Sequence, residues 1–223
     1  MNNISKEDYL SIIYKYQDTD GEIKPNIIAE KLQISAAAVT DMIKKLAKDK
    51  YILYERYKGI KLTVRGMDYA RNMVRRHRIW EVFLMKVIGL PWDKVHDEAH
   101  RLEHSCSDDL VDRIEKILDY PEFDPHGDPI PSKEGKLPKI KKHLPLANLK
   151  EGESGTVIRV NDFDEHFLAY ISGIGIGLNE IIRVKEKRGF DNSLLVLIKD
   201  KPWSISQKLA ENIFVEPKKV KGA

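Results

Sequence analysis

The sequence predicts a mainly α-helical protein with a β-rich C-terminal part. Three observations support this fold class. Apolar residues recur at helical intervals of three and four through roughly the first 118 residues. Residues 121–145 are rich in proline and show no such period, which is typical of a connector. The residues beyond them form short apolar or β-branched runs separated by turns, and we expect these to build a small β-barrel.

The N-terminal part predicts a helix-turn-helix followed by a hairpin. Ser5 stands where it would cap a first helix, and Pro25 suits the first turn of a second, short one. Ser35 is placed to cap a third, longer helix. Residues 51–62 then read as two strands around a Lys58-Gly59 turn. A hairpin directly after a helix-turn-helix is a wing, so residues 1–72 are expected to form a winged helix-turn-helix domain.

The middle of the chain predicts further helices. Thr63 would cap a long helix that runs to about Ile88, where Gly89 and Pro91 interrupt the pattern. A helix resumes over 93–104, and Ser107 would cap another over 108–118. We expect residues 73–140 to form a helical domain and residues 148–223 the β-rich one. Strands are expected over 152–160, 167–171, 180–185, 194–198 and 213–215.

Charge is unevenly distributed along the chain. Residues 44–76 hold eleven Lys or Arg against three Asp or Glu, and residues 96–124 hold ten Asp or Glu against three Lys or Arg. This indicates one surface for a polyanion and one pocket for cations, or alternatively two solvated helical faces of opposite charge. The single cysteine, Cys106, excludes a framework of intramolecular disulfides. We expect a cytoplasmic protein without membrane segments, because the longest apolar runs are far too short to cross a bilayer and the first residues are polar.

The third predicted helix and the wing are the candidate DNA interface. The start of the second helix of a helix-turn-helix faces base edges in the major groove. Its small residues would allow close approach, and basic residues would contact phosphates. The expected DNA-binding residues are Ser35, Ala37, Ala38, Thr40, Lys44, Lys45, Arg56, Lys58 and Lys61. The alternative is a protein-interaction module whose lysines only maintain solubility.

Four histidines indicate metal binding. His96, His100 and His104 recur every fourth residue and would share one helix face. His96 and His104 would lie about 12 Å apart along the axis, so one ion cannot be held by both. The pattern therefore predicts two sites: one holds His100, Glu103 and His104, and the other draws on His96, with the i,i+4 pair of His77 and Glu81 on the preceding helix. A single histidine can equally be a surface or capping residue, which is the interpretation we adopt for His126 and His143.

These residues resemble the diphtheria toxin repressor family of iron- and manganese-dependent repressors. The matching stretches are His77-Arg78, Glu81, Ile88-Gly89-Leu90, the run from Lys94 to His104, and Ser107-Asp108. In the tail, Gly175-Ile176 and Glu180-Ile181-Ile182 are similar to the SH3-like (FeoA-like) domain of the long family members. The resemblance covers the whole chain. It implies a homodimer that binds double-stranded, palindromic operator DNA with metal as corepressor and represses metal-uptake genes.

The resemblance also implies the ligand sets. The primary site would consist of Asp8, His100, Glu103 and His104, and the ancillary site of His77, Glu81 and His96, with two ions per subunit. The SH3-like domain of long members adds ligands near the place where Asp164, Glu165 and His166 stand here. An ion joining Asp8 to the other primary ligands would fix the winged helix relative to the dimer domain.

The chain departs from both branches of the family. Iron-sensing members have Met at the position of Asp8 and Cys at that of His100. Manganese-sensing members have Asp at the first position, but usually Glu at His100 and a further Glu at Ser11. The nitrogen and oxygen donors place Mn²⁺ ahead of Fe²⁺, although Zn²⁺ would bind such a set more tightly. The alternatives are a sensor of Fe²⁺ or Zn²⁺, a metal-independent winged-helix regulator and, more remotely, a di-metal hydrolase. We do not expect the protein to be an enzyme, because no substrate-binding domain is evident.

Overall fold

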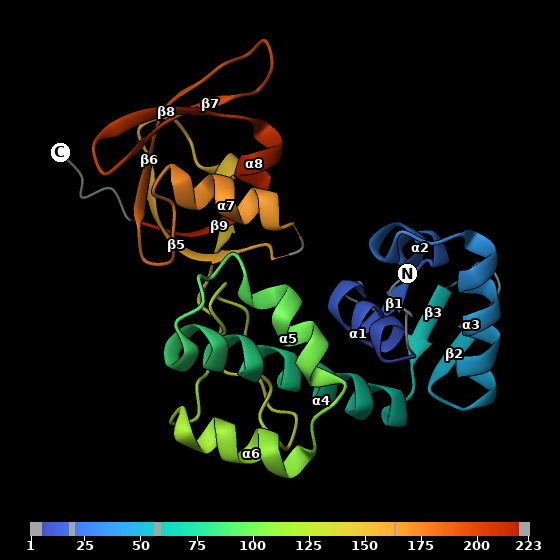
Figure 1. The fold of residues 1–223 in the computed structure, drawn as a ribbon. Helices are drawn as coiled ribbons and strands as arrows, with labels where there is room; N and C mark the ends of the chain where they lie inside the picture. The colour runs from blue at the N-terminus through green and yellow to red at the C-terminus, as the bar shows by residue number, and fades with distance from the viewer. Residues whose placement is uncertain (1–5, 18–20, 56–58, 163, 219–223) are drawn as a thin grey trace. The chain divides into compact units, whose positions relative to one another are not determined.

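The computed structural model describes residues 6–17, 21–55, 59–162 and 164–218 (Figure 1). Two compact units divide the chain. The first comprises residues 1–76 and 131–137, and the second comprises residues 77–130 and 138–223. The division falls between Arg76 and His77, inside one helix. The predicted class, helical first and β-rich at the C-terminus, is confirmed.

The first unit is a winged helix-turn-helix. Its elements are α1 (Lys6–Tyr16), β1 (Glu22–Ile23), α2 (Pro25–Leu32), α3 (Ala36–Lys48), β2 (Ile52–Glu55), β3 (Gly59–Leu62) and the start of α4 (Val64–Phe83). Helix α2 ends because Gln33 adopts a left-handed conformation, with φ at 52°. Two residues later the Ser35 side chain accepts a hydrogen bond from the Ala38 amide and starts α3. These two caps produce the tight turn between the helices.

A three-stranded antiparallel sheet completes this unit, in the order β1-β3-β2. Strands β2 and β3 form the predicted hairpin, with Ile52 opposite Leu62. The two-residue strand β1 was not predicted, because a strand of that length carries no periodic signal; it pairs Ile23 with Ile60. The sheet packs against the three helices around a buried core that includes Leu10, Ile28, Ile43, Leu46 and Ile60.

The helical part of the second unit contains the rest of α4, a π-helical turn η1 (Leu84–Ile88), α5 (Val95–Glu103) and α6 (Asp108–Ile117). The predicted long helix therefore continues to Ile88, and Gly89 ends it with φ at 83°. Ser107 caps α6 as predicted by accepting a hydrogen bond from the Leu110 amide. The helices lie beside one another in Figure 1 and share a core that includes Ile79, Val95, Ala99, Val111 and Ile114.

The rest of the second unit is an SH3-like domain. It contains β4 (Leu144–Pro145), a 3₁₀ turn η2 (Leu146–Asn148), β5 (Ser154–Val160), α7 (Glu165–Gly173), β6 (Ile181–Lys187), β7 (Leu194–Ile198), β8 (Lys201–Ile205), α8 (Gln207–Glu211) and β9 (Ile213–Pro217). The antiparallel sheet has the order β4-β9-β5-β6-β7-β8.

One strand prediction was wrong. Residues 167–171 belong to helix α7, although their apolar side chains suggested a strand. The Asp164 side chain caps this helix by accepting hydrogen bonds from the amides of His166 and Phe167. Leu168 and Ile171 then lie one helical turn apart and are both buried in the core of the domain. The cap, rather than the apolar run, decides the local structure.

Candidate metal centre and nucleic-acid interface

The first group of candidate ligands, here called the α5 cluster, consists of His100, Glu103 and His104. Glu103 is the last residue of α5, and His104 follows it as the C-cap. His100 Nδ1 lies 3.0 Å and His104 Nε2 lies 3.3 Å from the same carboxylate oxygen, Glu103 Oε1. The helix thus brings two imidazoles and one carboxylate together within a single turn, as the spacing predicts.

Asp8, the fourth residue of the predicted primary site, belongs to the other compact unit. It lies in the first turn of α1, where a carboxylate also favours the helix through the positive end of its dipole. Its role as a ligand stays a prediction.

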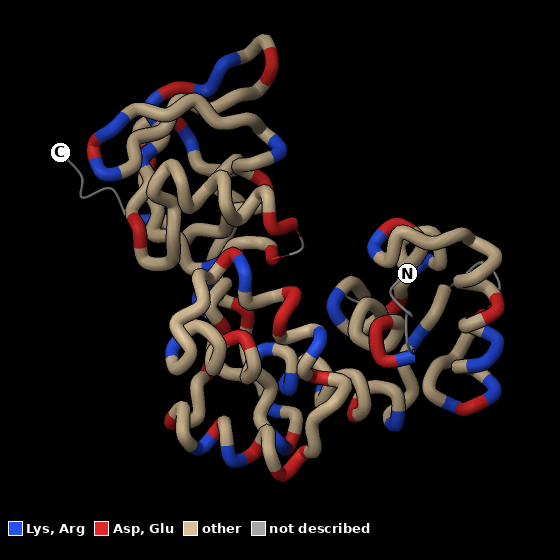
Figure 2. The backbone as a smooth tube through the Cα atoms, in the orientation of Figure 1, with Lys and Arg blue, Asp and Glu red and all other residues tan. Residues whose placement is uncertain are grey.

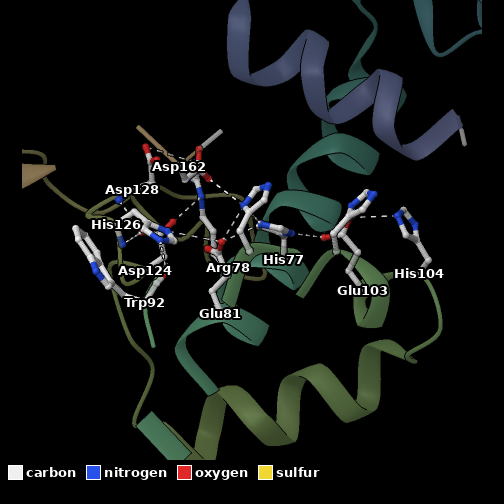
Figure 3. Close-up of polar contacts among 12 residues, drawn as sticks. His77, Arg78, Glu81, Trp92, Glu103, His104, Asp124, His126, Asp128 and Asp162 are labelled. Carbon is white, nitrogen blue, oxygen red and sulfur yellow. Dashed lines mark hydrogen bonds and ion pairs between the residues drawn. The ribbon is translucent and has the colours of Figure 1, made fainter. Parts of the chain in front are cut away.

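The second group, here called the α4 cluster, consists of His77, Glu81, His96 and Asp162 (Figure 3). Glu81 Oε1 lies 3.0 Å from His77 Nε2 and 3.1 Å from His96 Nδ1. These two ring nitrogens are themselves 3.1 Å apart. Asp162 Oδ2, in the loop after β5, lies 3.5 Å from His96 Nδ1. The residues predicted for the ancillary site, His77, Glu81 and His96, therefore lie in contact, and Asp162 of the SH3-like domain adds one carboxylate to them.

The residue that supplies this carboxylate is not one of the three expected here from the sequence, Asp164, Glu165 and His166. Asp164 is used as the cap of α7, and Glu165 forms an exposed ion pair with Lys94 at 3.1 Å. His166 is exposed at the start of α7. Asp162, two residues before the predicted stretch, is the side chain that reaches His96. An offset of this size could not be resolved from sequence, because loop residues carry no periodic pattern.

His77 connects the two clusters. Its Nε2 faces Glu81 in the α4 cluster, and its Nδ1 lies 2.6 Å from Glu103 Oε2 in the α5 cluster. Burial would lower the pKa of His77, but the charges of Glu81 and Glu103 outweigh it and raise this pKa to about 10. Burial likewise opposes ionisation of Glu103, yet His77 and His100 lower the pKa of that carboxyl to about 2. Without an ion, the single charge of a protonated imidazole therefore offsets half of the charge of two ionised carboxylates, and a divalent cation would offset all of it.

The donor atoms fit a metal ion. Ligands at about 2.1 Å from an octahedral ion are about 3 Å from their neighbours, which is close to the spacing of Glu81 Oε1, His77 Nε2 and His96 Nδ1. All four side chains of the α4 cluster offer oxygen or nitrogen. The sulfur of Cys106 is engaged elsewhere, since it accepts a hydrogen bond from Trp80 Nε1 at 3.3 Å.

Two buried groups were missed from sequence. His126 was interpreted as a surface or capping residue, and this was wrong: its side chain is fully buried, and its Nε2 lies 2.9 Å from the carbonyl oxygen of Trp92. Asp124 is buried beside it and lies 3.4 Å from Arg78 Nε. Both belong to the proline-rich connector, where only the short polar run Asp124-Pro125-His126-Gly127-Asp128 could have drawn attention. His143 is exposed, as expected.

The predicted DNA-contacting residues that the structure describes in the first unit are all exposed. Lys61 on β3 is solvent-exposed. The predicted residues on α3 and at its cap are also exposed, namely Ser35, Ala37, Ala38, Thr40, Lys44 and Lys45. Figure 2 shows the lysines along α3. The Thr40 hydroxyl donates to the Ala36 carbonyl at 2.8 Å, which fixes its orientation. Arg56 and Lys58 of the wing lie outside the described residues.

Comparison with known proteins identifies the family. The family model described as the iron-dependent repressor N-terminal DNA-binding domain matches residues 3–60. The model of the metal-binding and dimerisation domain of the same repressors matches residues 63–132, and the FeoA domain matches residues 144–217. The chain belongs to the iron-dependent repressor family. Members of this family are metal-dependent transcriptional repressors, which are not a class of enzymes.

Solved structures of relatives agree with this assignment. A manganese-dependent transcriptional repressor in complex with manganese is 36% identical, with a TM-score of 0.86 over 95% of this chain and 99% of that one. The manganese regulator SloR is 33% identical, with a TM-score of 0.80 over 96% and 99%. ScaR with bound Cd²⁺ is also 33% identical, with a TM-score of 0.82 over 96% and 99%. Within the part of this chain that the structure describes, no helix is long and apolar enough to cross a membrane.

Proposed function

We propose that this iron-dependent repressor family member is activated by Mn²⁺, with Fe²⁺ as the second candidate, and represses metal-uptake genes by binding a palindromic operator as a homodimer in the cytoplasm. The observation that supports this most strongly is the position of His77 between two clusters of oxygen and nitrogen donors. Two ligand sets joined by one imidazole suit a protein that senses a divalent ion. In this proposal the ion is a corepressor and takes part in no catalysis.

The primary ion would be held by the α5 cluster together with Asp8. Because Asp8 belongs to α1 of the winged helix, an ion shared between it and α5 would restrict the position of the recognition helix α3. In the absence of metal, closely set carboxylates disfavour that arrangement. Metal would thereby select the conformation in which two recognition helices fit successive major grooves, about 34 Å apart.

The ancillary ion would be held by the α4 cluster, with Asp162 as its ligand from the SH3-like domain. The proposed functional division follows the predicted domains: residues 1–72 read DNA, 73–140 dimerise and bind metal, and 148–223 support the ancillary site. The match to a dimerisation domain supports the homodimer. Exposed apolar side chains on and after α6, namely Leu110, Ile117 and Tyr120, supply a surface for it.

The choice of Mn²⁺ rests on ligand chemistry and on the relatives. Carboxylate oxygen suits Mn²⁺, whereas thiolate would favour softer ions, and the one cysteine of the chain is hydrogen-bonded to Trp80. A similar repressor has been solved with manganese, and ScaR with Cd²⁺ and with Zn²⁺. Selectivity against Zn²⁺ would then depend on coordination number, because Zn²⁺ binds most nitrogen and oxygen sites more tightly.

The test is DNA binding followed by fluorescence anisotropy. The DNA comes from the upstream region of the chain's own gene and from neighbouring metal-uptake promoters. Mn²⁺, anaerobic Fe²⁺ and Zn²⁺ are titrated against a chelated control. We expect tight binding only with metal, and a loss of metal response of ten- to a hundredfold or more in Glu103→Gln and Asp8→Asn, because an amide is a much weaker ligand than a carboxylate and losing a direct ligand costs at least as much metal affinity as losing a group that supports one.

The matched control is Glu98→Gln. Glu98 lies on the same helix as Glu103, but its side chain is 40% exposed and pairs with Arg101. This variant should bind DNA like the wild type. Equal binding of the wild-type protein with and without metal would overturn the corepressor mechanism and leave a winged-helix regulator with a different signal.

A further inference from the structure

Asp8 lies in the part of α1 that is intrinsically the least stable. It is the third residue of a helix that begins at Lys6. The first four amides of a helix have no hydrogen-bond partner within the helix, and helix ends fray for this reason. An ion that binds Asp8 would therefore order or move the first turn alone, unless other contacts join this turn to the rest of the winged helix.

Two tyrosines make such contacts with the residues that precede Asp8. The Tyr69 hydroxyl, on α4, donates a hydrogen bond of 2.6 Å to Glu7 Oε1. Lys6 Nζ lies 4.9 Å from the ring centroid of Tyr51 and 4.7 Å from that of Tyr69. The two rings meet edge to face, with their centroids 5.5 Å apart. We call Lys6, Glu7, Tyr51 and Tyr69 the tyrosine clamp.

The hydrogen bond between Tyr69 and Glu7 is the strongest contact of the clamp. Its donor is a phenol and its acceptor a carboxylate, and charge-assisted hydrogen bonds of this kind are short and about twice as strong as neutral ones. Burial and the Glu7 carboxylate raise the pKa of Tyr69, so the hydroxyl keeps its proton. The attraction of the Lys6 ammonium to the two ring faces adds to it.

Tyr51 joins the clamp to the C-terminal end of the recognition helix. It lies in the short loop after α3, and its amide donates a hydrogen bond of 3.0 Å to the carbonyl of Leu46 in the last turn of α3. Its side chain is buried, and its hydroxyl accepts a hydrogen bond of 3.1 Å from Arg65 Nη2. The contact of Lys6 with Tyr51 therefore reaches the end of α3.

On the other side of Asp8, Tyr9 reaches the N-terminal end of the same helix. Its side chain is buried in the core that includes Val39 and Ile43 of α3. Its hydroxyl lies 3.5 Å from the carbonyl oxygen of Ala38, in the first turn of α3. This is long for a hydrogen bond, so the packing of the ring contributes most. The turn that carries Asp8 is thus attached to both ends of the recognition helix.

We propose that Tyr69 is a positioning residue for the metal response: through Glu7 it holds Asp8 at a fixed place relative to α3. An ion bound to Asp8 then orients the recognition helix and not only the first turn of α1. This rests on the proposed function, in which Asp8 is a ligand of the primary ion. Without the clamp the turn could shift independently of α3, and a smaller part of the free energy of metal binding would favour the DNA-binding conformation.

The test measures how much Mn²⁺ tightens DNA binding. The Kd of the full-length protein for labelled upstream DNA is measured with saturating Mn²⁺ and with a chelator, and the ratio of the two values is the metal enhancement. Tyr69→Phe should lower this enhancement about tenfold, the factor expected for one hydrogen bond to a charged group, and leave the Kd of the chelated protein unchanged. Because coupling is reciprocal, the gain in Mn²⁺ affinity on adding DNA should fall by the same factor.

Tyr14→Phe is the matched control. Tyr14 lies on α1 and packs against the same core, but its hydroxyl forms no hydrogen bond with any residue that the structure describes. This variant should keep the full enhancement. The double variant of Glu7→Ala and Tyr69→Phe shows whether the two residues act together. It should lose no more enhancement than either single variant, because each change removes the same hydrogen bond.

An equal loss of DNA affinity with and without Mn²⁺ in Tyr69→Phe would reveal a purely structural role and overturn the proposal, as would an unchanged enhancement. Losses that multiply in the double variant would also overturn it, since Tyr69 would then not act through Glu7. Wild-type protein that binds DNA equally with and without Mn²⁺ would instead overturn the proposed function.

Discussion

Gly127 is the residue whose replacement most directly tests the placement of the loop that carries Asp124 and His126. Its φ is +91°, and a Cβ at this position would lie 2.0 Å from the Ile158 carbonyl oxygen and 2.9 Å from Arg159 Cα. Both neighbours are backbone of β5 and cannot rotate away. Gly127→Ala must therefore displace the loop, together with the hydrogen bond of 2.9 Å from the Val160 amide to the His126 carbonyl.

The cost can be worked out from these contacts. A left-handed conformation costs a non-glycine residue about 1–2 kcal/mol. Forcing an extra methyl group into a packed position adds about 1–3 kcal/mol, and a weakened backbone hydrogen bond adds about 1 kcal/mol. We expect a loss of about 3–6 kcal/mol for Gly127→Ala. The control, Gly152→Ala, has a similar φ of +83° but meets no described atom within 4 Å, so only the conformational cost of about 1–2 kcal/mol applies.

Thermal unfolding followed by tryptophan fluorescence measures the difference. All three tryptophans, Trp80, Trp92 and Trp203, belong to the second unit, so the signal reports on the unit that contains Gly127. At roughly 3 °C per kcal/mol, the apo protein should lose about 10 °C or more in Tm with Gly127→Ala and about 3–6 °C with Gly152→Ala. Equal losses in the two variants would refute the reasoning, because they would show that the loop does not press against β5.

Three further predictions concern the interface, the recognition helix and the buried arginine. Lys44→Ala should reduce the slope of log K against log salt concentration for DNA binding by about 1, whereas the control Lys116→Ala on α6 should leave this slope unchanged. An unchanged slope for Lys44→Ala would show that Lys44 does not contact the phosphates. Ser35→Ala removes the cap of α3, which stabilises the helix by about 1 kcal/mol, so hydrogen exchange of the amides in the first turn of α3 should accelerate about fivefold. Unchanged exchange rates would contradict a stabilising role for the hydrogen bond of 3.2 Å from the Ala38 amide to the Ser35 hydroxyl. Arg78→Met leaves the buried Asp124 without its cation and should cost about 3–5 kcal/mol in the apo protein, measured by the same tryptophan signal. Its control, Arg113→Met on the surface of α6, should leave Tm unchanged, and similar losses in both would argue against a buried ion pair at Arg78.

The helical elements could be predicted because their signals are local. Ser35 and Ser107 are followed by apolar residues at helical spacing, and both serve as N-caps in the structure. The α5 cluster was equally accessible, because residues three and four apart on one helix must share a face. The i,i+4 pair of His77 and Glu81 belongs to the same class of signal.

The remaining features depend on tertiary contacts. Asp162 reaches His96 only because the loop after β5 packs beside α5, and no spacing in the sequence encodes that approach. His126 and Asp124 lie in a proline-rich connector, where polar residues are ordinarily solvated, and their burial depends on contacts with Trp92 and Arg78 that no local pattern encodes. The helix at 165–173 was missed for a different reason: the five-residue apolar run 167–171 fits a strand or a helix, and the cap supplied by Asp164 decides between them.

The central claim, that a divalent ion controls DNA binding, is tested most directly by removing the ion from a preformed complex. Labelled upstream DNA is saturated with Mn²⁺-loaded protein, a chelator is added in excess while anisotropy is followed, and Mn²⁺ is then restored. We expect the anisotropy to fall to the value of free DNA and to recover when Mn²⁺ is added. Anisotropy that stays high after chelation, with the protein shown to be metal-free, would contradict it.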